Sequence, residues 1–156
     1  MGFKQLTKEE AKLKIKELVA EYTSKIKDRE LSLDERNTER FIERILQILN
    51  WDIDNFDQVI RRDSVKVEDR RKIPDYVLYI NGEKKVVVEA KSFSESLNNP
   101  QYIKQALEYG YYKQVRVSIL TNGKEIRVYD PFILSKSSEG KLLFSLHIDQ
   151  YENLFD

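Results

Sequence analysis

The chain has 156 residues, and its 27 Lys plus Arg are balanced by 27 Asp plus Glu, so the formal net charge is zero. This length suits a single domain with its own core, and a neutral chain that binds nucleic acid must do so through a local basic surface or a partner. The absence of Cys excludes disulfides, zinc–thiolate sites and Cys nucleophiles, and a single His, His147, argues against a His-ligated transition-metal cluster.

Two helices are predicted in the first third of the chain. Thr7 and Glu10 form a capping box, and apolar residues then recur at helical spacing as far as Ile26. A second helix ends near Asn50. Its predicted apolar face consists of Ile42, Ile45, Leu46 and Leu49.

From Val59 onward the pattern indicates strands. Val59, with Val65 and Val67 among charged residues, predicts a half-exposed strand. Two further strand-like runs flank Asn81-Gly82, which is a strong hairpin signal, and the unbroken Val run at 86–88 suits a central strand covered on both faces. The remaining predicted elements, in chain order, are strands over 76–80 and 85–90, a helix over 100–112, and strands over 115–120, 125–129 and 142–148. The expected fold is therefore α/β (α+β), with helices packed on a mixed sheet.

Acidic and basic residues stand at the ends of the two hairpin strands. Asp75 opens one strand, and Glu89, Ala90 and Lys91 close the next. A carboxylate where a strand leaves the core has a desolvation cost unless a cation accepts it. Asp75 and Glu89, aided by the Ala90 backbone carbonyl, are therefore candidates to hold Mg²⁺, which takes oxygen ligands, with Mn²⁺ able to substitute.

Lys91 shares a strand face with Glu89 because side chains alternate along a strand. A divalent ion acidifies a bound water, which can then attack a phosphorus atom. We expect Lys91 to position that water or to stabilise the charge that builds up on the phosphate.

The spacing of the hairpin decides whether Asp75 and Glu89 can share one ion. With a two-residue turn at Asn81-Gly82, Asp75 faces Val88, and Glu89 points to the opposite face of the sheet. A three-residue loop over 81–83, or a bulge in either strand, puts Asp75 directly opposite Glu89, with Cβ atoms ~4.5–5.5 Å apart. We predict one of these two arrangements.

Each of these residues also has a simpler interpretation. Asp75 can be a turn residue after Pro74, and Glu89 with Lys91 can be a solvated ion pair. The pattern Pro-Asp followed by Glu-x-Lys is short enough to arise by chance, so the surrounding sequence has to decide.

That surrounding sequence contains further motifs in a fixed order. They are an acidic helix over 35–43, Leu49-Asn50-Trp51-Asp52, Ile73-Pro74-Asp75-Tyr76, Val88-Glu89-Ala90-Lys91, Gln105-Ala106-Leu107-Glu108-Tyr109, Leu120-Thr121-Asn122-Gly123 and Val128-Tyr129-Asp130. Over about three fifths of its length, the chain thereby resembles the N-terminal nuclease domain of type I restriction enzyme R subunits, within the PD-(D/E)xK nuclease superfamily. The family usually has Gly where Asn50 stands, and Asn also tolerates a left-handed backbone.

The resemblance implies a restriction-endonuclease-like core and a Mg²⁺-dependent endonuclease that hydrolyses DNA. It maps Asp75, Glu89 and Lys91 onto the catalytic triad of the superfamily. Gln105 and Tyr109 match a Gln-x-x-x-Tyr element of these domains, and a separation of four residues places both on one helix face. The resemblance makes them predicted DNA contacts, since Gln can bond a phosphate or base edge and Tyr can stack or donate to a phosphate. Alternatively, Tyr109 simply packs its helix.

The family also places an acidic residue on the helix before the sheet. Glu35 lies closer than Glu39 to the predicted apolar face, and Glu43 points away from it. A capping box formed by Ser32 and Glu35 offers a competing explanation for Glu35. Glu35 is the first choice for a catalytic residue, with Glu39 as the alternative.

Basic clusters flank the expected site in the sequence. They can track a DNA backbone, or they can be solvated loops. The clusters are Arg61-Arg62, Arg70-Arg71-Lys72 and Lys84-Lys85.

Two functional hypotheses follow. The first is an endonuclease acting on DNA, which we expect to be double-stranded, although the sequence does not exclude RNA. The second is a non-catalytic nuclease-fold module that binds DNA or a protein partner. The 156 residues contain no Gly-rich Lys-Ser/Thr phosphate loop, so the helicase activity of R subunits is not implied. A neutral enzyme should bind DNA weakly alone, so we expect a specificity or motor partner, or a homodimer.

We expect one nuclease-like domain over residues 1–156, with an N-terminal helical extension over about 7–30 and a core over about 32–150. No segment has the apolar length of a signal peptide or a membrane span. We therefore expect no membrane association and a cytoplasmic location.

Overall fold

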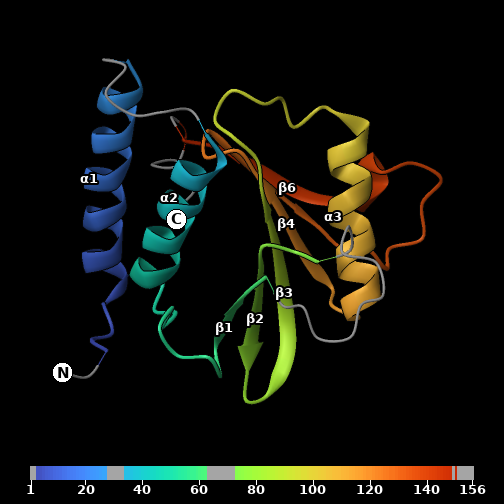
Figure 1. Cartoon of the computed structure of the whole chain (residues 1–156), viewed down its shortest axis with the longest axis horizontal. Helices are drawn as coiled ribbons and strands as arrows, with labels where there is room; N and C mark the ends of the chain where they lie inside the picture. The colour runs from blue at the N-terminus through green and yellow to red at the C-terminus, as the bar shows by residue number, and fades with distance from the viewer. Residues whose placement is uncertain (1–2, 28–33, 63–72, 149, 151–156) are drawn as a thin grey trace.

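The computed structural model describes residues 3–27, 34–62, 73–148 and 150. Within these residues the chain forms three α-helices and one six-stranded mixed sheet (Figure 1). In chain order the elements are α1 (Lys8–Lys27), α2 (Glu35–Ile48), β1 (Val59–Arg61), β2 (Tyr76–Ile80), β3 (Glu83–Ala90), α3 (Pro100–Lys113), β4 (Val117–Thr121), β5 (Glu125–Tyr129), a 3-10 turn (Glu139–Lys141) and β6 (Leu142–His147).

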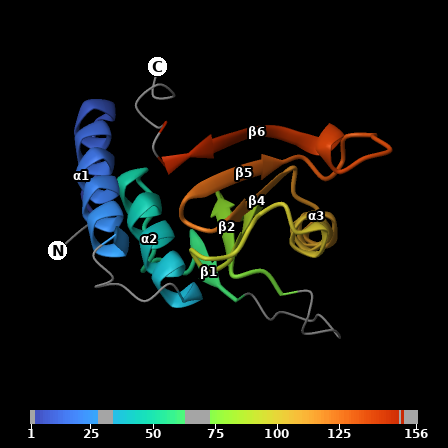
Figure 2. The same ribbon diagram turned by 90° about the horizontal axis from the view of Figure 1, so that it is seen from above.

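The sheet follows the order of the chain, β1-β2-β3-β4-β5-β6. Neighbouring strands are antiparallel except β3 and β4, which are parallel and therefore need a crossover connection. α3 supplies that crossover, on the other side of the sheet from α1 and α2 (Figures 1 and 2). The predicted α/β restriction-endonuclease-like fold, with an added N-terminal helix, is confirmed.

The helix starts follow from local capping. The backbone N–H of Thr7 donates to the Glu10 carboxylate at 2.9 Å, and the Glu10 N–H donates to the Thr7 hydroxyl at 3.2 Å, so the predicted capping box is confirmed. α2 is capped by Asp34, whose side chain accepts from the Asn37 N–H at 3.1 Å. Ser32, the expected cap, lies outside the described residues.

β3 is the central strand that the Val run predicts. Val88 packs into a core cluster with α1 and α2, while Val87 points to the opposite face and packs with Val77 and with Tyr109 of α3. Both valines are 1% exposed. The strand is thus covered on both faces, which explains the absence of alternation in its sequence.

A bulge separates two registers in the β2–β3 hairpin. At the turn, Ile80 pairs with Glu83, and Asn81 and Gly82 both have positive φ, as a two-residue hairpin turn requires. The register then shifts between Leu78 and Tyr79, and beyond the shift Tyr76 pairs with Val88. The predicted bulge is therefore confirmed, and the three-residue loop is not formed.

Other element boundaries differ from the expectations by a few residues. β1 ends at Arg61, while Val65 and Val67 fall outside the described residues. β4 begins at Val117 rather than 115, and α3 ends at Lys113, followed by Gln114 in a left-handed conformation. No helix in the described part of the chain is long and apolar enough to cross a membrane.

Candidate active site

The expected site residues converge where β2 begins and β3 ends. Glu35, the first residue of α2, reaches this point from the helix layer. One carboxylate oxygen of each of Glu35, Asp75 and Glu89 lies within 4.8 Å of the others. The three side chains form what we call the carboxylate cluster.

Asp75 is fixed in the cluster by the neighbouring strand. It directly precedes β2, and its Oδ2 accepts a hydrogen bond from the backbone N–H of Ala90 at 2.8 Å. Continuing the register of Tyr76 and Val88 by one residue puts Asp75 opposite Glu89. Asp75 and Glu89 are only 8% and 5% exposed, so each carboxylate is held away from bulk water.

Burial makes ionisation of the three carboxyl groups unfavourable. Burial, followed by repulsion from Asp75, raises the pKa of Glu89 to about 8. The pKa of Asp75 is also raised, chiefly by burial, and the pKa of Glu35 is raised by burial and then by the charge of Asp75. A cation between the three groups would offset both burial and repulsion.

One oxygen of the cluster has no hydrogen-bond partner among the residues that the structure describes. Among the described residues, Glu89 Oε2 is buried and has no hydrogen-bond partner, although buried carboxylate oxygens normally have one. A hard divalent ion such as Mg²⁺ takes carboxylate oxygens as ligands. The donor set of the carboxylate cluster and the partnerless oxygen therefore fit a divalent cation.

Lys91 lies against the cluster and is held from three sides. Its Nζ donates to Glu89 Oε1 at 3.1 Å and to Gln105 Oε1 at 2.8 Å. The same ammonium lies 4.6 Å from the centre of the Tyr102 ring, a distance at which cation–π attraction is significant. Lys91 thus has a defined position beside Glu89, as the strand alternation predicts.

Gln105 and Tyr109 of α3 form a chain of hydrogen bonds that leads to Lys91. Gln105 contacts Lys91, and Gln105 Nε2 donates to the Tyr109 hydroxyl at 2.7 Å. Tyr109 is 3% exposed and belongs to the core between α3 and the sheet. The Tyr109 hydroxyl accepts from Gln105 within this core, and DNA contact by Gln105 and Tyr109 stays a prediction.

The three glutamates of α2 have separate partners. Glu35 joins the carboxylate cluster, whereas Glu39 pairs with Arg62 at 2.6 Å. Glu43 accepts from Arg61 at 2.7 Å and from the Tyr76 hydroxyl at 2.9 Å. The structure thus brings together Glu35, and not Glu39, with Asp75 and Glu89.

Tyr102 is a residue of the site to which the sequence analysis gave no role. Besides its contact with Lys91, it donates from its hydroxyl to Glu95 at 2.9 Å. It precedes Gln105 by three residues, a spacing that places both on one helix face. That spacing is the signal that could have identified it.

The motif Thr121-Asn122-Gly123 holds the loop between β3 and α3 in place. The Lys91 N–H donates to the Thr121 carbonyl at 2.8 Å, and Asn122 Nδ2 donates to the Glu95 carbonyl at 2.7 Å. Gly123 has a φ of +85°, and a Cβ there would overlap the ring of Phe93. The motif thus supports the site from β4 without reaching the carboxylates.

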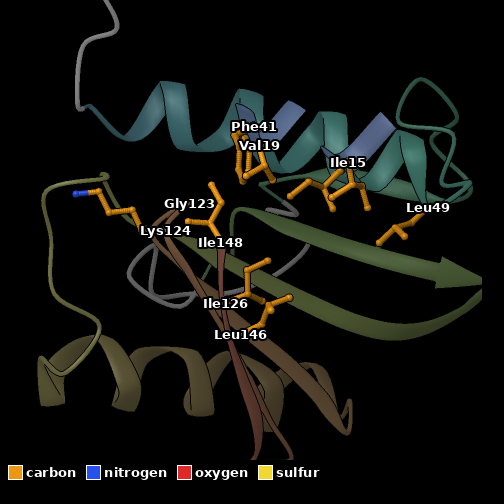
Figure 3. A pocket seen from close by; sticks show the side chains of 10 residues that line it. Ile15, Val19, Phe41, Leu49, Gly123, Lys124, Ile126, Leu146 and Ile148 are labelled. Atoms are coloured by element: carbon orange, nitrogen blue, oxygen red, sulfur yellow. The ribbon is translucent and has the colours of Figure 1, made fainter. Parts of the chain in front are cut away.

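A separate apolar cavity of about 210 Å³ lies between the helices α1 and α2 and the strands β5 and β6 (Figure 3). Its lining residues include no carboxylate, and the ammonium of Lys124 points away from it. Without convergent polar groups, this cavity has no chemistry that competes with the carboxylate cluster.

Residues 5–133 match the family described as Type I restriction enzyme R protein N terminus. No curated protein and no solved structure matches. Because the match covers most of the sequence, the chain belongs to the family of type I restriction enzyme R protein N termini and is a nuclease-like module of that enzyme class.

Proposed function

We propose that this chain is a Mg²⁺-dependent endonuclease that hydrolyses phosphodiester bonds of DNA. The proposal rests on one observation above all: Glu89 Oε2, in a cluster of three carboxylates beside Lys91, has no hydrogen-bond partner in the described part of the chain. Family membership supports DNA as the substrate class.

Asp75, Glu89 and Glu35, with the Ala90 backbone carbonyl, would hold the ion. A bound Mg²⁺ would supply an acidified water and neutralise charge on the phosphate. In the hydrolysis a water oxygen bonds to phosphorus, and the ester oxygen leaves and takes up a proton.

Lys91 would act on the charge that develops during this reaction. Its ammonium is held by Glu89 and Gln105, so it need not reorganise when negative charge builds up on the phosphate oxygens. Such preorganised donors contribute about 3–4 kcal/mol each in well-studied sites. Gln105 would orient Lys91 and contact the substrate, and Tyr109 would orient Gln105.

The test is a plasmid-nicking assay with Mg²⁺ or Mn²⁺. We expect Asp75→Ala and Lys91→Ala to lower the cleavage rate at least about a hundredfold. Asp57→Ala and Lys124→Ala are matched controls, because they remove the same charges from exposed positions outside the site, and they should cleave like the wild type. Cleavage that survives both site substitutions would refute the assignment.

Metal binding provides a second, independent measurement. Calorimetric titration of the wild type with Mg²⁺ should show binding that Asp75→Asn weakens and Asp57→Asn does not. A wild type that binds DNA but neither binds Mg²⁺ nor cleaves would instead favour a non-catalytic DNA-binding module.

A further inference from the structure

Arg62 lies beside the carboxylate cluster in an uncommon backbone conformation. It directly follows β1, and its N–H donates to the backbone carbonyl of Asp75 at 2.7 Å. Its φ is +46°, a region that residues other than Gly rarely adopt and that is over-represented at functional sites. The hydrogen bond to Asp75 ties the position of Arg62 to that of the cluster.

Within the described part of the chain, the side chain of Arg62 contacts Glu39. Arg62 Nη2 lies 2.6 Å from Glu39 Oε1, and the Arg62 side chain is 61% exposed. Glu39 follows Glu35 by four residues in α2, so the ion pair lies about one helical turn from the cluster. The guanidinium carries five N–H donors, and its exposure leaves part of that donor set facing solvent.

The neighbouring pair of Arg61 with Glu43 already ties these elements together. Glu43 accepts from Arg61 of β1 and from the Tyr76 hydroxyl of β2. This three-residue contact joins α2 to two strands. The contact between Arg62 and Glu39 adds a second link between α2 and the end of β1, but it does so with the more exposed of the two arginines.

We propose that Arg62 binds a DNA backbone phosphate next to the carboxylate cluster, and that Glu39 occupies the guanidinium until DNA displaces it. This inference rests on DNA being the substrate, as proposed above. A phosphate matches the planar donor fork of Arg as well as a carboxylate does, and an exposed ion pair is weak enough to exchange.

The charge of the site gives the reason for such a residue. Three carboxylates converge at the proposed metal site, and the two positive charges of one Mg²⁺ do not fully offset three negative charges beside the scissile phosphate. Lys91 is already held by Glu89 and Gln105. Arg62 adds a second positive charge beside the site, in a chain whose net charge is zero.

The experiment measures the affinity of the whole chain for a short, fluorescently labelled DNA duplex by anisotropy. Ca²⁺ replaces Mg²⁺ to suppress cleavage, and KCl is varied from roughly 50 to 200 mM. We expect Arg62→Ala to weaken binding about three- to tenfold. The slope of log K against log[KCl] should fall by the amount expected for the loss of about one phosphate contact. Arg62→Lys should lose less, because it keeps the charge.

Glu39→Gln should change the affinity for DNA in the opposite direction from Arg62→Ala. An ion pair that only stabilises the fold would not produce this opposite change. Removing the internal competitor should tighten DNA binding about two- to fivefold, and most of that gain should disappear when Arg62→Ala is added. The matched control is the surface pair of Arg44 with Glu21, at 3.1 Å between α2 and α1. Arg44→Ala and Glu21→Gln should change affinity by less than the corresponding site variants.

The inference is overturned if Arg62→Ala binds like Arg44→Ala, or if Glu39→Gln fails to tighten binding. A nicking assay on the same proteins separates this failure from failure of the proposed function. If the wild type cleaves normally and Arg62→Ala does not weaken DNA binding, only the proposed role of Arg62 is refuted. Affinity that depends on Arg62, in a wild type that does not cleave, refutes the nuclease and supports the role of Arg62.

Discussion

Asp75 lies opposite Glu89 across β2 and β3 because β3 carries one more residue than β2 between the turn and the site. That residue is Lys85, which has no partner in the pairing of β2 with β3. If Lys85 paired with Leu78 in a regular ladder instead of bulging out, Asp75 would face Val88, and the Glu89 side chain would point to the opposite face of the sheet. The carboxylate cluster thus depends on the register of this hairpin.

Deleting Lys85 should therefore preserve the cluster. The pairs Tyr79–Lys84 and Leu78–Val86 would become consecutive, and the hairpin would be regular from turn to site. The Lys85 side chain is half-exposed and pairs with Glu83 on the same strand, so we expect the free energy of unfolding to change by about 1 kcal/mol or less. Calorimetry should find Mg²⁺ affinity retained. A stable deletion variant that no longer binds Mg²⁺ would show that the bulge itself shapes the site.

The sequence predicts the hairpin of β2 and β3 and the start of α1 well, because the signals for these elements are local. The turn at Asn81-Gly82, the Val run of β3 and the capping box of Thr7 with Glu10 each involve a few adjacent residues. The need for a bulge follows from counting residues between Asp75 and Glu89.

Contacts between distant segments are less accessible to such reasoning. The sequence places Gln105 and Tyr109 on one helix face, yet only packing decides that Tyr109 is buried and reaches Lys91 through Gln105. The left-handed backbone of Arg62 has no residue-type signal, since Arg carries no preference for that region. Whether Glu35 or Glu39 joins the carboxylates depends on where α2 lies over the sheet.

Glu89 should make the stability of the metal-free protein depend on pH. Its pKa is raised from 4.5 to about 8 in the folded state, mainly by burial. The folded state therefore holds a proton that the unfolded state has lost, and the free energy of unfolding falls as pH rises from about 4.5 to about 8. The loss from this group is on the order of a few kcal/mol.

Urea unfolding in EDTA at several pH values measures this dependence. Glu89→Gln cannot ionise, so its stability should fall less than that of the wild type over the same interval. Adding Mg²⁺ should restore much of the loss, because the ion binds the ionised form of the folded state. Equal pH dependence of wild type and Glu89→Gln would contradict the shifted pKa.

Gln105 should affect turnover more than substrate binding, because it orients Lys91. Gln105→Leu removes the 2.8 Å contact with the ammonium, and a misplaced catalytic group can cost about a hundredfold in rate. Tyr109→Phe keeps the buried ring and removes only the hydroxyl that accepts from Gln105, so we expect a smaller fall in kcat, about tenfold or less.

Steady-state cleavage assays separate kcat from KM for these variants. Tyr22→Phe is the matched control, since it removes a hydroxyl from another buried tyrosine, in α1, and should leave kcat unchanged. If Gln105→Leu raises KM while kcat stays constant, Gln105 binds substrate and does not orient Lys91.

Gly123 should tolerate substitution much less well than Gly82, although both have positive φ, +85° and +78°. Gly82→Ala meets no atom within 4 Å, so it should cost only the strain of a left-handed backbone, about 1–2 kcal/mol. Gly123→Ala carries that strain and also overlaps the buried ring of Phe93, which adds about 1–3 kcal/mol. Phe93 follows Lys91 by two residues, so its displacement should also disturb the ammonium.

Urea unfolding and cleavage rates together test this expectation. Gly123→Ala should be the less stable of the two variants and should cleave more slowly than Gly82→Ala at a temperature where both remain folded. The difference in rate matters most, because loss of stability alone would leave the folded fraction fully active. Equal rates at equal folded fraction would mean that the Phe93 ring moves without disturbing Lys91, and that the support of the site from β4 does not pass through this contact.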